Sequence, residues 1–152
     1  MKRTFLRIAV AAVAMFGVVS SAAAQQPSEE TLVRRTVESY LHGLKFNDVT
    51  SLEKAFAPEA KLFFVKKDGS MGQLTQAQWY KGFEANAGKE EEGTLEIVSV
   101  DITGNAASVK VREEYPGSIY TDYVALLKLG GEWKIVNKIF VAEPTSHAVS
   151  TP

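Results

Sequence analysis

Three carboxylate side chains in the C-terminal half of the sequence have the spacing to meet on one face of a β-sheet. Glu96, Glu113 and Asp122 lie in segments that alternate apolar and polar residues, as strands do. Folding the chain at two-residue turns, 104–105 and 116–117, sets Glu96 opposite Glu113, with Asp122 one step along on the next strand. Converging carboxylates repel one another, which raises a pKa, recruits a cation or requires a basic ligand group. The alternative is that this end of the sheet is open to water, where such charges cost little.

Other polar and aromatic residues complete the candidate site. A turn at 130–131 places Asn137 opposite Val124 and Asp122 opposite Ile139, so Asn137 needs a hydrogen-bonding partner if it is buried. Aromatic residues from the helices can line a cavity, although at helical spacing they are more often plain core. The predicted ligand-binding set is Tyr40, Trp79, Phe83, Glu96, Glu113, Tyr120, Asp122 and Asn137. In an enzyme, Asp122 or Glu113 would be the catalytic residue, as general acid or base.

The opposite face of the same strands carries too many large apolar residues for a plain solvated surface. Tyr123, Leu127, Val136 and Phe140 alternate there with lysine and arginine residues. This pattern predicts a homodimer through the convex face of the sheet, and a merely mixed exterior is the alternative.

The elements that must position these residues follow an α+β order. The apolar stripe of residues 33–44 predicts a helix capped by Ser28, and Thr50 with Glu53 predicts the capping box of a short second helix that Pro58 stops. A strand at 61–66 and a weak return at 71–74 precede a third helix, which begins with the Thr75 and Gln78 capping box. Four strands follow at 94–103, 106–115, 118–129 and 132–142. We predict a cone-shaped fold in which three N-terminal helices pack on a strongly bent, mixed or antiparallel sheet, with a pocket between them.

The start of the chain resembles a secretory signal peptide. Lys2, Arg3 and Arg7 make a basic start, residues 8–19 are almost wholly apolar, and Ala22-Ala23-Ala24 supplies a cleavage site. We therefore expect an exported protein, periplasmic or secreted, cleaved near Ala24, with a domain over residues 25–144 and a flexible tail over 145–152. The signal holds three of the 17 basic residues and none of the 18 acidic ones, so the remaining chain has a net charge of 14 − 18 = −4.

This composition argues against several classes of function. A mildly acidic domain without a basic run argues against nucleic acid as a partner, and against a membrane partner after cleavage. The chain has no cysteine and two histidines, His42 and His147, so no zinc site is expected, and no cofactor either.

Two stretches of the chain are distinctive: "FAPEAKLFF" follows two predicted helices, and "TDYVALLKLGGEWKIVNKIF" ends the domain. They resemble the nuclear-transport-factor-2-like superfamily, and within it the putative lumazine-binding proteins. The resemblance covers residue 32 to about residue 144 and implies the cone-shaped fold, a pocket and frequent dimers. Members of the superfamily include ketosteroid isomerases, polyketide cyclases, dehydratases and transport factors. Many relatives have a histidine before the proline where this chain has Ala57, so that histidine's role does not carry over.

Three functions fit this reading. The leading hypothesis is an exported, non-catalytic protein that holds a small, partly apolar molecule, because the pocket predicted here lacks an evident nucleophile or histidine base. The second is an enzyme of isomerase, cyclase or dehydratase type that uses a pocket carboxylate as general base. The third is a dimeric structural module whose cavity is filled by its own side chains.

Overall fold

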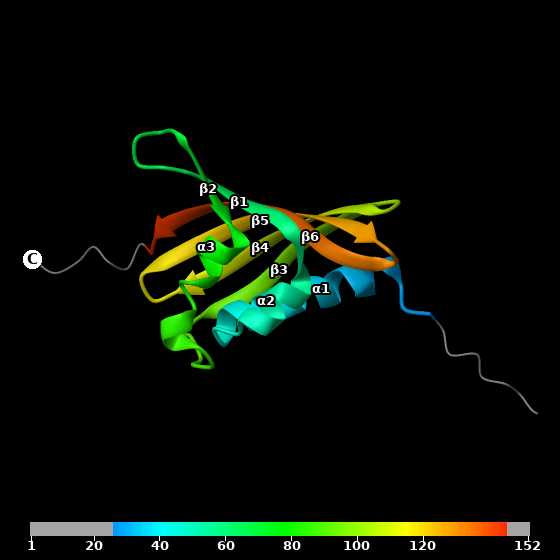
Figure 1. The fold of residues 1–152 in the computed structure, drawn as a ribbon, viewed down its shortest axis with the longest axis horizontal. Helices are drawn as coiled ribbons and strands as arrows, with labels where there is room; N and C mark the ends of the chain where they lie inside the picture. The colour runs from blue at the N-terminus through cyan, green and yellow to red at the C-terminus, as the bar shows by residue number, and fades with distance from the viewer. Residues whose placement is uncertain (1–25, 146–152) are drawn as a thin grey trace, which may run out of the picture.

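The computed structural model describes residues 26–145, which form helices packed against one mixed sheet (Figure 1). The predicted signal peptide lies outside the described residues, and so does the predicted tail beyond residue 145. Within residues 26–145, no helix is long and apolar enough to cross a membrane.

The helices begin at side-chain caps. Helix α1 spans Glu29–Lys45 behind Ser28, whose hydroxyl accepts from the Thr31 amide. Helix α3 spans Gln76–Tyr80, and the predicted capping box of Thr75 and Gln78 is confirmed. A 3₁₀ turn, η1, follows at Glu84–Asn86.

The second helix, α2 (Val49–Ala55), differs from the prediction at both ends. Asp48 rather than Thr50 caps it, because the Asp48 carboxylate accepts from the Thr50 amide. The helix ends at Ala55, before Pro58, and the next strand begins at once. Pro58 lies inside that strand where the register gives no pairing partner on either side, so its missing amide proton costs no ladder bond.

Six strands form the sheet in the order β2-β1-β6-β5-β4-β3. Their bounds are β1 Phe56–Val65, β2 Met71–Thr75, β3 Thr94–Thr103, β4 Ala106–Tyr115, β5 Ser118–Leu129 and β6 Glu132–Pro144. Strands β1 and β6 pair in parallel and the other neighbours are antiparallel, so the sheet is mixed. Strand β1 starts five residues before the predicted position, at residue 56 instead of residue 61.

The register between β4 and β5 is the predicted one. Val111 lies opposite Asp122, and Glu113 lies opposite Tyr120. A two-residue turn leaves no freedom to slide the strands, so the turn at 116–117 determines which residues meet.

Bulges change the predicted faces of two other strands. The β3–β4 register shifts between Ile97 and Ser99, which turns Val98 outward and Ile97 toward the helices. The β5–β6 register also shifts: Leu126 pairs with Ile135, but the preceding residue, Ala125, pairs with Asn137. Val136 is therefore the extra residue in β6. One extra residue on β6 moves every later side chain of that strand to the other face of the sheet.

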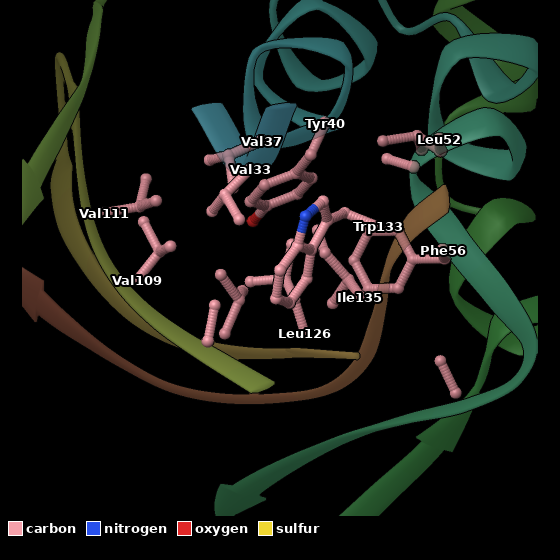
Figure 2. Packing of buried hydrophobic residues seen from close by; sticks show 14 of the residues in the cluster. Val33, Val37, Tyr40, Leu52, Phe56, Val109, Val111, Leu126, Trp133 and Ile135 are labelled. Atoms are coloured by element: carbon pink, nitrogen blue, oxygen red, sulfur yellow. The ribbon is translucent and has the colours of Figure 1, made fainter. Parts of the chain in front are cut away.

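Helices α1 and α2 lie on one face of the sheet, and the core fills the space between them (Figures 1 and 2). Val33, Val37 and Tyr40 of α1 point toward the sheet in Figure 2. The buried partners that they meet come from β1, β4, β5 and β6: Phe56, Val109, Val111, Val124, Leu126, Trp133 and Ile135. The same arrangement presents polar side chains of the inner sheet face to the C-terminal half of α1.

Candidate functional site

Four polar side chains from four elements meet inside the domain. Tyr40 comes from α1, Glu113 from β4, Asp122 from β5 and Lys138 from β6, and they are 0%, 3%, 0% and 4% exposed. Tyr40 is placed by the helical stripe that also carries Val33 and Val37. We call these four residues the buried network.

The Tyr40 hydroxyl lies at the centre of the buried network. It is 2.8 Å from Glu113 Oε1 and 2.5 Å from Lys138 Nζ, and it donates to Asp122 Oδ2. Lys138 Nζ is also 2.6 Å from Asp122 Oδ2 and 4.0 Å from Glu113 Oε1. Asp122 Oδ1 is buried and has no hydrogen-bonding partner in the described structure. Two carboxyl groups therefore share one ammonium group and one phenol.

Burial changes the protonation of this network. The pKa of Glu113 rises from its ordinary 4.5 to about 8, chiefly because burial disfavours the carboxylate. The attraction of Lys138 opposes this rise, and the neighbouring charge of Asp122 adds to it. Burial also raises the pKa of Tyr40 well above that of a free phenol. At neutral pH Glu113 is therefore a carboxylic acid and Tyr40 a neutral phenol.

Proton counting gives each contact a direction. The Tyr40 hydroxyl has a single proton, which it donates to Asp122. Protonated Glu113 can donate in turn to the Tyr40 oxygen across their 2.8 Å contact, and Lys138 donates to the same oxygen. The sum of charges is then zero, with Lys138 offsetting Asp122, which suits a site closed to water.

A cavity of about 430 Å³ opens beside this network. Glu113 and Lys138 belong to its wall, whereas Tyr40 and Asp122 lie behind them and are not among the lining residues. The lining is mainly aromatic and acidic: Leu44, Asn47, Trp79, Phe83, Glu91, Glu92, Glu113, Tyr115, Pro116, Ser118, Tyr120, Lys138 and Phe140. A second hollow of about 400 Å³ near α1 and the β5–β6 turn contains no member of the buried network, so the chemistry belongs to the first.

Aromatic rings surround the Lys138 ammonium group. Its nitrogen is 5.0 Å from the centre of the Tyr40 ring, 5.3 Å from that of Trp79 and 5.0 Å from that of Phe140. Ring faces attract a cation, and more strongly where water is excluded. Trp79 and Phe140 also line the cavity, so a flat, partly apolar molecule would contact both rings and charged groups.

One wall of the cavity is a charged loop fixed to α1. Lys45 Nζ donates to the Glu91 carbonyl at 2.6 Å, and Asn47 Nδ2 donates to the Lys89 carbonyl at 3.0 Å and to Glu91 Oε1 at 2.8 Å. Asn47 has a φ of 49°, a left-handed conformation that asparagine tolerates. These bonds hold Glu91 and Glu92 at the cavity wall.

The structure brings together six of the eight predicted site residues. Tyr40, Glu113 and Asp122 form the buried network, and Trp79, Phe83 and Tyr120 line the cavity with Glu113. Glu96 is not part of this group. The bulge pairs it with Arg112 and leaves it exposed, so the predicted Glu96–Glu113 pair is wrong.

Asn137 is also misplaced in the prediction. The β6 bulge pairs it with Ala125 on the face away from the helices, and Lys138 takes the inward position beside Val124. The predicted Asp122–Ile139 pair is Asp122–Phe140 instead. Sequence reasoning therefore missed Lys138, together with Tyr115 and Phe140 of the cavity wall. The one available signal was the position of Lys138 between Val136 and Phe140 in the period-two alternation, which had assigned all three to the outer face.

The bulge also corrects the predicted dimer surface. Phe140 turns to the cavity and leaves that surface, and Val136 is half-buried. Tyr123 and Leu127 remain on the outer face, 49% and 39% exposed. Pairing of two copies through this face stays a prediction.

Replacing both Tyr123 and Leu127 by serine tests that pairing. We expect the unchanged protein to sediment as a dimer and the double variant as a monomer, because burial of such side chains supplies most of a dimer's stability. A Val65→Ser, Met71→Ser variant, altered at exposed apolar residues elsewhere on the sheet, serves as the control. An unchanged protein that remains monomeric at high concentration in analytical ultracentrifugation would exclude this interface.

Comparison with known proteins supports the fold and the family. A nuclear-transport-factor-2-like protein of unknown function from Shewanella baltica has 28% identity and a TM-score of 0.70, over 77% of this chain and 95% of that one. A second such protein, from Silicibacter pomeroyi, has 23% identity and a TM-score of 0.66, over 75% and 95%. A protein named aldolase FrzH from a Cladobotryum species is 22% identical over 118 residues, 77% of this chain and 94% of that protein. The family model described as putative lumazine-binding matches residues 28–141, so the chain belongs to that family and has the nuclear-transport-factor-2-like fold.

Proposed function

We propose that the cavity binds a small, partly apolar aldehyde or ketone, and that Glu113 moves a proton to or from it. The observation that carries this proposal is the position of Glu113, a buried carboxylic acid in the wall of an aromatic cavity. A pKa of about 8 lets one group act as acid and, after loss of its proton, as base near neutral pH. Such a group suits isomerase, cyclase, dehydratase or aldol chemistry beside a carbonyl group.

The neighbouring groups fit the charge changes of such a reaction. Removing a proton beside a carbonyl group places negative charge on the carbonyl oxygen. Lys138 Nζ, 4.0 Å from Glu113 Oε1 in the same wall, would stabilise that charge, and Tyr40 connects the two groups by hydrogen bonds. The relative named aldolase carries the name of a reaction at a carbonyl compound, which supports the same substrate class.

The second candidate is ligand binding without catalysis. The aromatic lining favours it, because Trp79, Phe83, Tyr120 and Phe140 supply contact area without any reactive group. Export after cleavage near Ala24 remains part of both proposals.

Proton exchange separates the two candidates. We would screen aldehydes and ketones of aromatic, sterol-like and polyketide-like type by thermal shift, then follow solvent deuterium entering the carbon beside the carbonyl of a bound compound. Glu113→Gln should slow this exchange about 10²–10⁴-fold, a usual contribution of a general acid or base, while the compound still binds. Glu96→Gln, an exposed carboxylate on the neighbouring strand, is the matched control and should leave the exchange rate unchanged.

Two outcomes would count against the proposal. Equal exchange in Glu113→Gln and the unchanged protein would leave only the binding function. Failure of every compound to stabilise the protein would remove both candidates and favour a structural module.

A further inference from the structure

Lys138 has the surroundings that an amine nucleophile requires. It is the lysine of the cavity wall within residues 26–145, with a carboxylate 2.6 Å away and the Glu113 carboxyl at 4.0 Å. We propose that Lys138 forms a covalent imine with an aldehyde or ketone bound in the cavity. This deepens the proposed function, from which it takes its substrate class.

The first requirement is a neutral amine, and Asp122 lies close enough to accept the proton that Lys138 must lose. The Asp122 carboxylate is fully buried, and its Oδ1 lacks a hydrogen-bonding partner in the described structure. Transfer of one proton from Lys138 Nζ to Asp122 Oδ2, across 2.6 Å, converts the ion pair into a neutral amine and a neutral acid.

The second requirement is an acid that protonates the oxygen that leaves. Lys138 Nζ attacks the carbonyl carbon, a C–N bond forms, and Glu113 gives its proton to the carbonyl oxygen to produce a carbinolamine. The carbinolamine nitrogen still carries two protons and returns one of them to Glu113. A proton from Asp122 then converts the hydroxyl into water as the C–O bond breaks. The nitrogen keeps one proton as an iminium ion, so an ammonium ion and a carbonyl compound have become an iminium ion and water.

The charge at the end of this sequence suits the same surroundings. The iminium ion is a cation at the position of the original ammonium ion, where the Tyr40, Trp79 and Phe140 ring centres lie 5.0, 5.3 and 5.0 Å away. Asp122 is again a carboxylate and offsets it. Glu113 has regained its proton, so both carboxyl groups end in the protonation states in which they began.

Another lysine on the same strand provides the contrast. Lys134 is 27% exposed, lies 3.3 Å from Glu132 Oε2 and donates to the Lys54 carbonyl, outside this cavity. It has neither a buried carboxylic acid nor an aromatic wall. Only the position of Lys138 combines an amine, a proton acceptor and a proton donor among the residues that line the cavity.

Reductive trapping tests the imine directly. The full chain is incubated with benzaldehyde, or separately with acetone, in the presence of cyanoborohydride, which converts an imine into a stable secondary amine. Peptide mapping by mass spectrometry then locates the modified lysines. We expect Lys138 to be modified at least about tenfold faster than Lys134, because only Lys138 has an acid and a base beside it.

Variants and unfolding make this result specific. Lys138→Arg keeps the positive charge but should remove the fast adduct, whereas Lys134→Arg should not affect it. Asp122→Asn should slow trapping at Lys138. Urea at a concentration that unfolds the chain should equalise the two lysines, and this needs no variant to fold.

The imine proposal can be disproved while the proposed function stands. Equal modification of Lys138 and Lys134 in the folded protein would overturn the imine. If deuterium exchange still depends on Glu113 in that case, proton transfer survives and proceeds without a covalent intermediate.

Discussion

Replacement of Lys138 by methionine should lower the free energy of unfolding by about 3–5 kcal/mol at pH 8. Methionine fills a similar volume, so the loss arises from charge and not from a cavity. Without the ammonium group, Asp122 and the ionised fraction of Glu113 are buried with no cation to offset them. Urea denaturation at pH 8 measures the effect. At pH 5 the loss should be smaller, because Glu113 is then protonated and one fewer negative charge is buried.

Two comparisons identify the cause of this loss. Lys134→Met changes a partly exposed lysine on the same strand and should alter stability by no more than about 0.5 kcal/mol. Adding Asp122→Asn to the Lys138→Met variant should restore part of the lost stability, since it removes a buried negative charge. If Lys138→Met and Lys134→Met have equal, small effects, the buried ion pair is not part of the folded protein.

The second large effect is on the pH dependence of stability. The pKa of Glu113 is raised on folding from 4.5 to about 8, so between these values the folded chain keeps a proton that the unfolded chain has released. Stability from this group is complete below pH 4.5 and is lost as the pH rises to about 8. Since one pKa unit corresponds to about 1.4 kcal/mol, the unchanged protein should lose on the order of 4 kcal/mol across this range.

Glu113→Gln should flatten this dependence and make the protein more stable than the unchanged one above pH 8. Glutamine keeps the shape of the protonated side chain and cannot ionise, so the contact with Tyr40 is retained. Urea midpoints measured from pH 5 to pH 9 give the two curves, and Glu96→Gln should follow that of the unchanged protein. A Glu113→Gln curve parallel to that of the unchanged protein would show that Glu113 ionises normally in the fold.

The sequence predicted the strands well where turns fix them. The bounds of β3, β4 and β5 agree with the prediction, and the β4–β5 register follows from the turn at 116–117. Helix α1 followed from its apolar stripe and its Ser28 cap, because both signals are local. The start of β1 was missed because Pro58 suggested a helix end, whereas the strand tolerates proline where its register has no partner.

The strand residues of the site were predicted correctly only where no bulge interrupts the strand. Glu113 and Asp122 were placed together correctly, because an unbroken register joins them. Glu96, Asn137 and Phe140 were assigned to the wrong faces, since one extra residue in β3 and in β6 reverses the alternation. Neither bulge is marked by glycine or proline: Val98 and Val136 lie in runs that read as regular strand. The same reversal hid Lys138, whose ammonium group accounts for how two buried carboxyl groups can coexist.

The protonation of Glu113 is the central claim, and it can be measured directly. Carbon-13 NMR of the glutamate side-chain carboxyl groups, assigned by comparison with Glu113→Gln, reports the titration of this single residue. The structure predicts a midpoint of about 8, with Glu113 protonated at pH 7. A midpoint near 4.5, the value of an ordinary glutamate, would contradict the proposed acid–base role of this cavity.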